Sequence, residues 1–555
     1  MSHPEIFVLI IVVAIVLRFA FWTIGRRHPV GNRARSMRWR IRFRRRPGPG
    51  YASALELSLR WACWRAVLGG KRARPGLPLW ARLCLPTTDC AVRLGRAQWF
   101  RRAWGRMEDQ TLILAPPRTG KSGFAADRML SHPGPCLATT TRTDLYELTA
   151  RGRAARGPIE VFNPQRVGNL PSTFAWNIVG GCEDPETAMR RAGALVGAVE
   201  QNTGDMPFWR SKASMALAAF LHAAALLDRD MITVFQWCNR HGDGEAVEAL
   251  ATDPRASRAL LSTLGEIQAP GKTADSIRVT MSETLTWVAI PVVASAVSPG
   301  AGRGFDVAEF IAQCGTLYMI AQDASDNAAV SPLFRAFAVE IHWEAGMLGS
   351  RSAAARLDPP LLMLLDEVTQ ICPVPLPAWL SDSAGKGILI AAACHSTDQL
   401  ATRWGDAGAA TVWATCGTKV FLPGIDDPGT LESVSVLCGD ITVAADVDGQ
   451  RRRERLRVVP PELLRTLPDW RALVMRTNLS PCVVKIRPAW KRRDVKTSRR
   501  QPVPALRPVS LVVPAMRAPG ELADWPPPKP AGNGGGSLPR PPRLSGAGVN
   551  GDNRS

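Results

Sequence analysis

The stretch that most constrains the fold of this chain is a short apolar run that passes through a loop into a lysine and a serine. In order it comprises Leu112, Ile113, Leu114, Ala115, Pro116, Pro117, Arg118, Thr119, Gly120, Lys121, Ser122 and Gly123. A strand, a tight loop and a helix N-terminus in this order form a P-loop, whose backbone N–H groups cradle phosphate oxygens. The usual pattern is G-x-x-x-x-G-K-[ST], and Ala115 stands where the first glycine is usual. The alternative interpretation is a turn that carries Gly-Lys-Ser by chance.

If this loop binds a nucleotide, residues 115–123 form the phosphate cradle. Lys121 would reach the β- and γ-phosphates, and the Ser122 hydroxyl would ligate Mg²⁺. The expected cofactors are therefore ATP and Mg²⁺.

Two acids far downstream complete the prediction. Residues 360–365 form a continuous apolar run, and Asp366 and Glu367 follow it directly. A buried central strand brings such acids to its carboxyl end, where the ligand sites of α/β folds form. Asp366 would hold Mg²⁺, and Glu367 would polarise the attacking water. The alternative is a buried strand followed by an acidic helix cap.

Another apolar run, residues 387–394, ends in a polar segment that contains His395 and Gln399. A polar side chain at this position would point at the γ-phosphate and act as a sensor of it. The alternative is that both residues are ordinary polar residues of a loop.

Apolar runs alternate with helical patterns over much of the chain, which predicts an α/β fold with a mostly parallel sheet. The expected strands are 110–114, 136–140, 159–162, 315–320, 360–365, 387–394, 412–422, 472–475 and 483–486. Residues 185–300 are alanine-rich and nearly strand-free, with helices expected at 209–227, 230–241, 244–251, 256–267 and 272–289. We interpret this segment as an all-α insertion that divides a nucleotide-binding domain into residues 107–184 and 301–490.

The N-terminus carries an apolar stretch, residues 6–24, that is interrupted only by Arg18. About 20 apolar residues span a bilayer, so residues 1–25 are predicted to be a transmembrane anchor. A secretory signal peptide fits less well, because the positive charges follow the apolar run instead of preceding it. Between Arg26 and Arg46 there are ten arginines and no acid. The positive-inside rule then places the N-terminus outside and the bulk of the chain in the cytoplasm, with a single span.

Residues 26–106 are expected to form a basic juxtamembrane region, and the arginines between Arg26 and Arg46 are expected to contact anionic lipid headgroups. Contact with DNA is the alternative for these arginines. An amphipathic or interfacial helix is expected within 51–75, with a second membrane span as the alternative. The formal net charge of +21 also favours an anionic partner, nucleic acid or lipid. Residues 491–555 are rich in Pro, Gly and Arg and are expected to form a disordered tail.

These motifs, in this order, resemble the type IV secretion coupling proteins, the TraG/TraD-like conjugative DNA-transfer ATPases. The likeness covers most of residues 107–490. It rests on Ala-Pro-Pro-Arg-Thr-Gly-Lys-Ser (115–122), Thr-Asp-Leu-Tyr (143–146), Phe-Asn-Pro (162–164), Trp-Asn (176–177), Phe-Trp-Arg (208–210), Leu-Leu-Asp-Glu (364–367), Ser-Thr-Asp-Gln-Leu (396–400) and Gly-Thr-Lys-Val-Phe (417–421). His395 stands where relatives often have glutamine.

The resemblance implies a RecA-like P-loop ATPase that is anchored in the membrane and assembles as a homo-hexamer. The implied partners are single-stranded DNA with an attached relaxase, the components of the type IV secretion channel and membrane lipids. Neighbouring subunits of such a ring would supply an arginine finger. Three alternatives stay open: an FtsK-type translocase of double-stranded DNA, a protein-secretion ATPase, and a substrate receptor with an inactive P-loop.

Overall fold

The computed structural model describes residues 29–98, 101–198, 206–240, 244–268, 271–298, 304–322, 330–447, 450–500, 502 and 504–508. The expected anchor, residues 1–25, and most of the expected tail lie outside these residues. Within the described ranges, no helix has the length and hydropathy needed to cross a bilayer.

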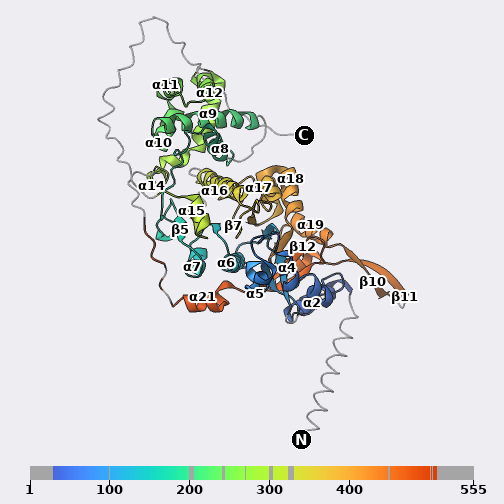
Figure 1. The fold of residues 1–555 in the computed structure, drawn as a ribbon. Helices are drawn as coiled ribbons and strands as arrows, with labels where there is room; N and C mark the ends of the chain where they lie inside the picture. The colour runs from blue at the N-terminus through green and yellow to red at the C-terminus, as the bar shows by residue number, and fades with distance from the viewer. Residues whose placement is uncertain are drawn as a thin grey trace, which may run out of the picture. The chain divides into compact units, whose positions relative to one another are not determined.

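A large, mostly parallel β-sheet forms the centre of the fold (Figure 1). Its eleven strands lie in the order β2-β1-β13-β12-β9-β3-β8-β7-β4-β6-β5. Their bounds are β1 (Ala91–Arg96), β2 (Arg102–Arg106), β3 (Thr111–Leu114), β4 (Cys136–Thr140), β5 (Ile159–Phe162), β6 (Thr316–Ile320), β7 (Leu361–Leu365), β8 (Ile388–Cys394), β9 (Thr418–Phe421), β12 (Arg471–Arg476) and β13 (Cys482–Lys485). The strands from β9 to β5 are parallel, and β2, β1, β13 and β12 extend the sheet with antiparallel pairings.

The register of the parallel strands places the predicted site residues along one edge. Leu114 at the end of β3 pairs with Cys394 of β8 and with Phe421 of β9. Leu365 at the end of β7 pairs with Ala392 of β8. The loops that follow β3, β7 and β8 therefore leave the sheet at neighbouring points on its carboxyl edge, where α/β ligand sites form.

Both faces of the parallel strands are covered, as expected for a sheet of apolar runs. On β7, Leu362 and Leu364 belong to a core with α6 (Lys121–Ser131) and α7 (Asp144–Arg153). Met363 and Leu365, on the opposite face, join a core with α16 (Ser331–Arg351). Further helices around the sheet are α15 (Val307–Ala312), α17 (Leu376–Asp382), α18 (Thr397–Thr415), α19 (Pro428–Cys438) and α20 (Pro461–Arg465).

The all-helical character expected within residues 185–300 is confirmed for the residues described there. The helices are α8 (Pro185–Val196), α9 (Met206–Leu226), α10 (Met231–Asn239), α11 (Glu245–Thr252), α12 (Arg258–Gln268), α13 (Lys272–Thr284) and α14 (Pro291–Ser295), with a 3₁₀ turn at Thr286–Ala289. They gather around α9, which contacts α8 and α10–α13 (Figure 1). The sequence analysis missed α8, which begins at Pro185 with an Asp184 N-cap.

The segment expected to be one interfacial helix, residues 51–75, folds differently, so that expectation is wrong. It forms two short helices, α3 (Ala54–Leu59) and α4 (Cys63–Gly69), and α4 packs against β1 and β2. Trp61 lies between the helices and is fully buried. The large apolar ring of Trp61 is stabilised by burial in a protein core, and the antiparallel part of the sheet forms that core. The N-terminal part also includes α2 (Pro29–Arg42) and α5 (Leu79–Cys84).

Three further differences concern local structure. The expected strand 412–422 begins only at Thr418, because α18 continues to Thr415. A two-stranded hairpin, β10 (Asp440–Val447) and β11 (Gln450–Arg457), was not expected and forms a separate sheet. The expected tail is folded at its start, where α21 (Arg493–Ser498) packs against α7. The division of the chain into domains stays a prediction.

Candidate nucleotide-binding site

The loop from Ala115 to Gly120 connects β3 to α6, as the sequence predicts. Gly120 has φ 101°, a left-handed conformation that favours glycine. The Thr119 hydroxyl donates a hydrogen bond to the Pro116 carbonyl oxygen at 2.7 Å, which ties the loop to itself. Pro117 and Arg118 are exposed at its tip.

Ala115 occupies the position of the missing glycine without strain. Its side chain is fully buried in a core with Ile113, Phe124 and Ala393. Its amide N–H donates to the Cys394 carbonyl oxygen at 3.0 Å, which continues the β3–β8 pairing by one residue. The methyl group is therefore a packing element, and the departure from the usual pattern leaves the loop intact.

The first turn of α6 offers backbone donors. The amide N–H groups of Lys121, Ser122 and Gly123 make no hydrogen bond with any group in the part of the chain that the structure describes. Such N–H groups at a helix N-terminus, together with the helix dipole, favour a bound anion. The residues present thus fit a phosphate group at this position.

Lys121 lies between the two acids that follow β7. Its Nζ is 3.0 Å from Asp366 Oδ1 and also contacts Glu367 Oε1. Burial alone would lower the pKa of Lys121, but the two carboxylates outweigh it and raise the pKa above its ordinary value. Burial raises the pKa of Asp366. A buried cation and two carboxylates meet here from segments far apart in the sequence.

His395 completes the cluster. Its Nδ1 is 2.8 Å from the Ala115 carbonyl oxygen, which can only accept, so Nδ1 donates the proton. Its Nε2 is 3.1 Å from Glu367 Oε2. The hydrogen bond to Glu367 raises the pKa of His395. Burial would raise the pKa of Glu367, but the hydrogen bond from His395 and the charge of Lys121 lower it.

The remaining predicted residues hold supporting positions. The Gln399 side-chain oxygen accepts from the His395 amide at 2.9 Å, so Gln399 faces the backbone of the loop. Ser122 makes no hydrogen bond with Asp366 within the described residues. Hydroxyl and carboxylate oxygens are suitable ligands for Mg²⁺, and both side chains stand at the loop, so the donor set fits the ion. Glu367 itself has φ 49°, a left-handed conformation that is uncommon for a non-glycine residue.

Two tryptophans that the sequence analysis did not single out contact the loop. A Cβ atom added at Gly120 would stand 2.9 Å from Cζ3 of Trp470, and one added at Gly123 would stand 3.4 Å from the rings of Trp470 and Trp490. The two rings pack edge to face with centroids 5.1 Å apart. Trp470 precedes β12 with φ 59°. No local pattern marks this residue, since its position depends on the antiparallel pairing of β12 with β9.

The strand order and the cluster around Lys121 together define a class of protein fold. A P-loop strand between β9 and β8, with acids on the next strand, β7, is the arrangement of a RecA-like P-loop nucleotide-binding domain.

Comparisons with known proteins identify the relatives within this class. Residues 360–469 match the family model described as the TraM recognition site of TraD and TraG. The fold matches the bacterial conjugative coupling protein TrwBdeltaN70 in an unbound form, at a TM-score of 0.54 and 20% identity, over 69% of this chain and 85% of that one. It matches the plasmid coupling protein TrwB in complex with ADP and Mg²⁺ at the same score, identity and coverage. It also matches TrwB in complex with a non-hydrolysable ATP analogue, at a TM-score of 0.53 and 20% identity, over 69% and 86% of the two chains.

No curated protein sequence matches the chain. The family match and the shared fold together confirm the resemblance to the type IV coupling proteins that the motifs predict.

Proposed function

We propose that the protein is a membrane-anchored ATPase that couples a relaxase–DNA substrate to a type IV secretion channel and translocates single-stranded DNA. The observation that carries this proposal is the cluster of Lys121, Asp366, Glu367 and His395 at the carboxyl edge of a RecA-like sheet. The match to a coupling-protein family model over residues 360–469 supports the coupling-protein part of this proposal. Solved structures of TrwB with ADP and Mg²⁺ support the choice of ligands.

Each residue of the cluster has a proposed role. Lys121 and the free N–H groups of the α6 N-terminus bind the phosphates and stabilise their developing charge. Ser122 and Asp366 would hold Mg²⁺, which neutralises phosphate charge when bound. Glu367 orients the attacking water and takes its proton.

The pairing of Lys121 with both acids has a consequence for catalysis. In the described arrangement the Lys121 ammonium neutralises Glu367, so the carboxylate is a weak base. Phosphates that draw Lys121 away would leave Glu367 with His395 alone. We propose that His395 then holds the Glu367 carboxylate in place. The predicted sensor residue would in this way respond to the phosphate through Lys121 and Glu367.

Membrane attachment, ring assembly and partners are parts of the same proposal. Residues 6–24 would anchor the chain in the inner membrane, with the described residues in the cytoplasm. A homo-hexamer would place an arginine finger at each site. The family description for residues 360–469 names TraM recognition, so we propose that this segment contacts a relaxosome protein of that kind.

The test measures ATP hydrolysis by the full-length chain in neutral detergent, with and without single-stranded DNA. Glu367→Gln is expected to keep nucleotide affinity and to lower kcat by about 10²–10⁴, the typical contribution of a general base. Lys121→Ala is expected to lose nucleotide binding. Glu266→Gln is the matched control, because Glu266 is an exposed acid of α12 whose ion-pair partner among the described residues is the partly exposed Lys212.

The results separate the alternatives. Hydrolysis that double-stranded DNA stimulates more than single-stranded DNA would favour the FtsK-type translocase. Hydrolysis that responds only to a protein substrate would favour the protein-secretion ATPase. Nucleotide binding without hydrolysis under any of these conditions would favour the receptor with an inactive P-loop.

A further inference from the structure

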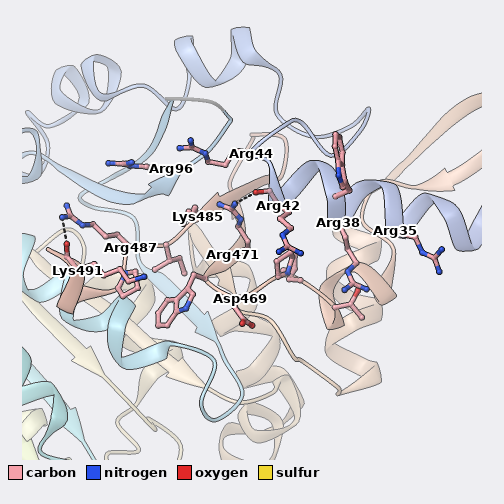
Figure 2. A pocket seen from close by; sticks show the side chains of 17 residues that line it. Arg35, Arg38, Arg42, Arg44, Arg96, Asp469, Arg471, Lys485, Arg487 and Lys491 are labelled. Atoms are coloured by element: carbon pink, nitrogen blue, oxygen red, sulfur yellow. Dashed lines mark hydrogen bonds between the residues drawn. The ribbon is translucent and has the colours of Figure 1, made fainter. Parts of the chain in front are cut away.

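A cavity of about 1230 Å³ lies between α2, the loop before β12 and the end of β13. Its charge is strongly one-sided, since seven arginines and two lysines line it against a single carboxylate, Asp469. Figure 2 shows that the cations come from several parts of the chain: α2, the end of β1 that carries Arg96, the start of β12, and the end of β13 with the residues after it. The cavity is separate from the Lys121 cluster, with Trp470 as the wall on the P-loop side.

These nine cations lack acidic partners in the described part of the chain. None of the nine forms an ion pair with an acid among the described residues. Burial and the neighbouring Arg44 lower the pKa of Arg471. Burial and the nearby cations, Arg471 first among them, lower the pKa of Lys485. The folded chain therefore keeps like charges together at a cost, which a bound anion would offset.

The position of α2 indicates where that anion comes from. Arg35, Arg38 and Arg42 follow one another at spacings of three and four residues, so they share one face of α2. The helix begins at Pro29, a few residues after the apolar run that ends at Ile24. At about 1.5 Å per helical residue, or about 3.5 Å if extended, Arg35 lies within roughly 15–40 Å of that run along the chain.

Exposed aromatic rings accompany these arginines. Phe43 is 58% exposed, and its ring packs on Trp39, a wall residue of the cavity, with centroids 4.8 Å apart. Tryptophan side chains such as Trp39 are enriched at the headgroup level of a bilayer. A nucleic-acid strand is the rival ligand, because bases also stack on exposed aromatic rings, but it does not explain the short link to the apolar run.

We propose that this cavity binds the phosphate groups of anionic phospholipids at the cytoplasmic face of the membrane. The proposal rests on the membrane anchoring proposed above and goes beyond it, because it assigns the lipids a defined cavity in the folded domain. Arg35, Arg38 and Arg42 are exposed residues at the outside of this cavity, and Arg471 is its buried one.

The test titrates full-length protein in a neutral detergent with dihexanoylphosphatidylglycerol and, separately, with dihexanoylphosphatidylcholine, by calorimetry. The variant R35Q/R38Q/R42Q removes three exposed charges that have no ion-pair partner in the described chain. At about 1 kcal/mol per basic residue near an anionic surface, its affinity for phosphatidylglycerol should fall on the order of 100-fold. R240Q/R258Q/K272Q removes three exposed charges of the all-α segment and should bind as the unmodified chain does.

A second variant tests the cavity by strengthening it. Asp469 is exposed and is the one acid among the lining residues, so D469N should tighten phosphatidylglycerol binding several-fold. A folding defect cannot produce such a gain.

Four results would overturn the proposal: equal binding of the two lipids, an unchanged affinity in the arginine variant, displacement of phosphatidylglycerol by a single-stranded oligonucleotide, or displacement by Mg·ATP. The last two would assign the cavity to nucleic acid or to the nucleotide site. Hydrolysis that is lost while lipid binding persists would contradict only the proposed ATPase function.

Discussion

Gly120 is the position at which a single methyl group should do most damage to the nucleotide-binding loop. Its φ of 101° is costly for any L-residue, and the left-handed region costs alanine about 1–2 kcal/mol. The added Cβ would also stand 2.9 Å from Cζ3 and 3.3 Å from Cη2 of Trp470. Overpacking of this kind costs about 1–3 kcal/mol. Gly120→Ala should therefore cost about 2–5 kcal/mol in the native loop conformation.

This cost can appear in two measurable quantities. If the loop keeps its shape, the free energy of unfolding falls by that amount. If the loop relaxes, the N–H groups of the α6 N-terminus lose their common direction, and the affinity for an ATP analogue falls by about 30- to 4,000-fold. Thermal unfolding and calorimetric titration of the same preparation capture both.

Gly123→Ala provides the matched control. This residue has helical backbone angles, and its added Cβ would meet the Trp470 and Trp490 rings at 3.4 Å, which is close to ordinary contact. Alanine also stabilises a helix by about 1 kcal/mol relative to glycine. Nucleotide affinity and unfolding temperature should therefore change little.

The double variant Gly120→Ala/Trp470→Leu divides the cost into its two parts. A smaller side chain at position 470 removes the contact with the new methyl group but leaves the strained φ. The loss of affinity and stability caused by Gly120→Ala should therefore be smaller in a chain that already carries Trp470→Leu than in the unmodified chain. Normal affinity and normal stability of Gly120→Ala would refute both the left-handed loop conformation and the Trp470 contact.

Three further predictions concern stability. Asp127 on α6 is buried and binds Arg93 at 2.5 Å and Arg492 at 2.8 Å, so Asp127→Asn should cost about 2–4 kcal/mol in denaturant unfolding. Trp61→Ala should cost about 3–5 kcal/mol, and Trp61→Phe clearly less, because the buried indole N–H makes no hydrogen bond. Burial lowers the pKa of His342 to about 4. Its contribution to stability is then full above pH 6.5 and is lost as the pH falls toward 4, so His342→Gln should lose about 3 kcal/mol less between pH 7 and pH 4.

The nucleotide site was largely predictable because parallel strands share one carboxyl edge. Lys121, Asp366, Glu367 and His395 each follow a recognisable apolar run, and adjacent strands bring such residues together whatever their separation in sequence. The structure confirms that these four side chains are in contact. Their catalytic and sensor roles stay predictions.

The antiparallel part of the sheet was not predictable in the same way. The strand at 91–96 reads Ala-Val-Arg-Leu-Gly-Arg, and its arginines and glycine hide the apolar alternation of a strand. It pairs with β2 over most of its length, and this two-stranded unit joins the rest of the sheet through the pairing of Arg96 with Lys485 of β13, almost 400 residues away in the chain. At 412–415 the opposite error arose, because Val412 and Trp413 favour strands but lie in the last turn of α18. In both cases tertiary contacts, and not the local sequence, determine the conformation.

Residues near both ends of the described chain contact the P-loop or the helix that follows it. A truncated chain can therefore test whether these contacts are needed for nucleotide binding. Arg93 of β1 and Arg492 before α21 bind Asp127, and Trp470 contacts Gly120. Without residues 29–106, the sheet loses β1 and β2, Asp127 loses one of its two cations, and the core that contains Ile113 and Phe124 loses Trp61.

A chain that begins at residue 107 retains every predicted nucleotide-binding residue, yet it should bind an ATP analogue poorly and unfold at a lower temperature. A chain that begins at residue 29 keeps these contacts and should bind as the full-length protein does. Equal affinities for the two truncated chains would show that the loop keeps its shape without the antiparallel strands. A loss confined to the shorter chain would instead establish that the basic N-terminal segment is part of the nucleotide-binding fold, so that any ligand of that segment acts within reach of the P-loop.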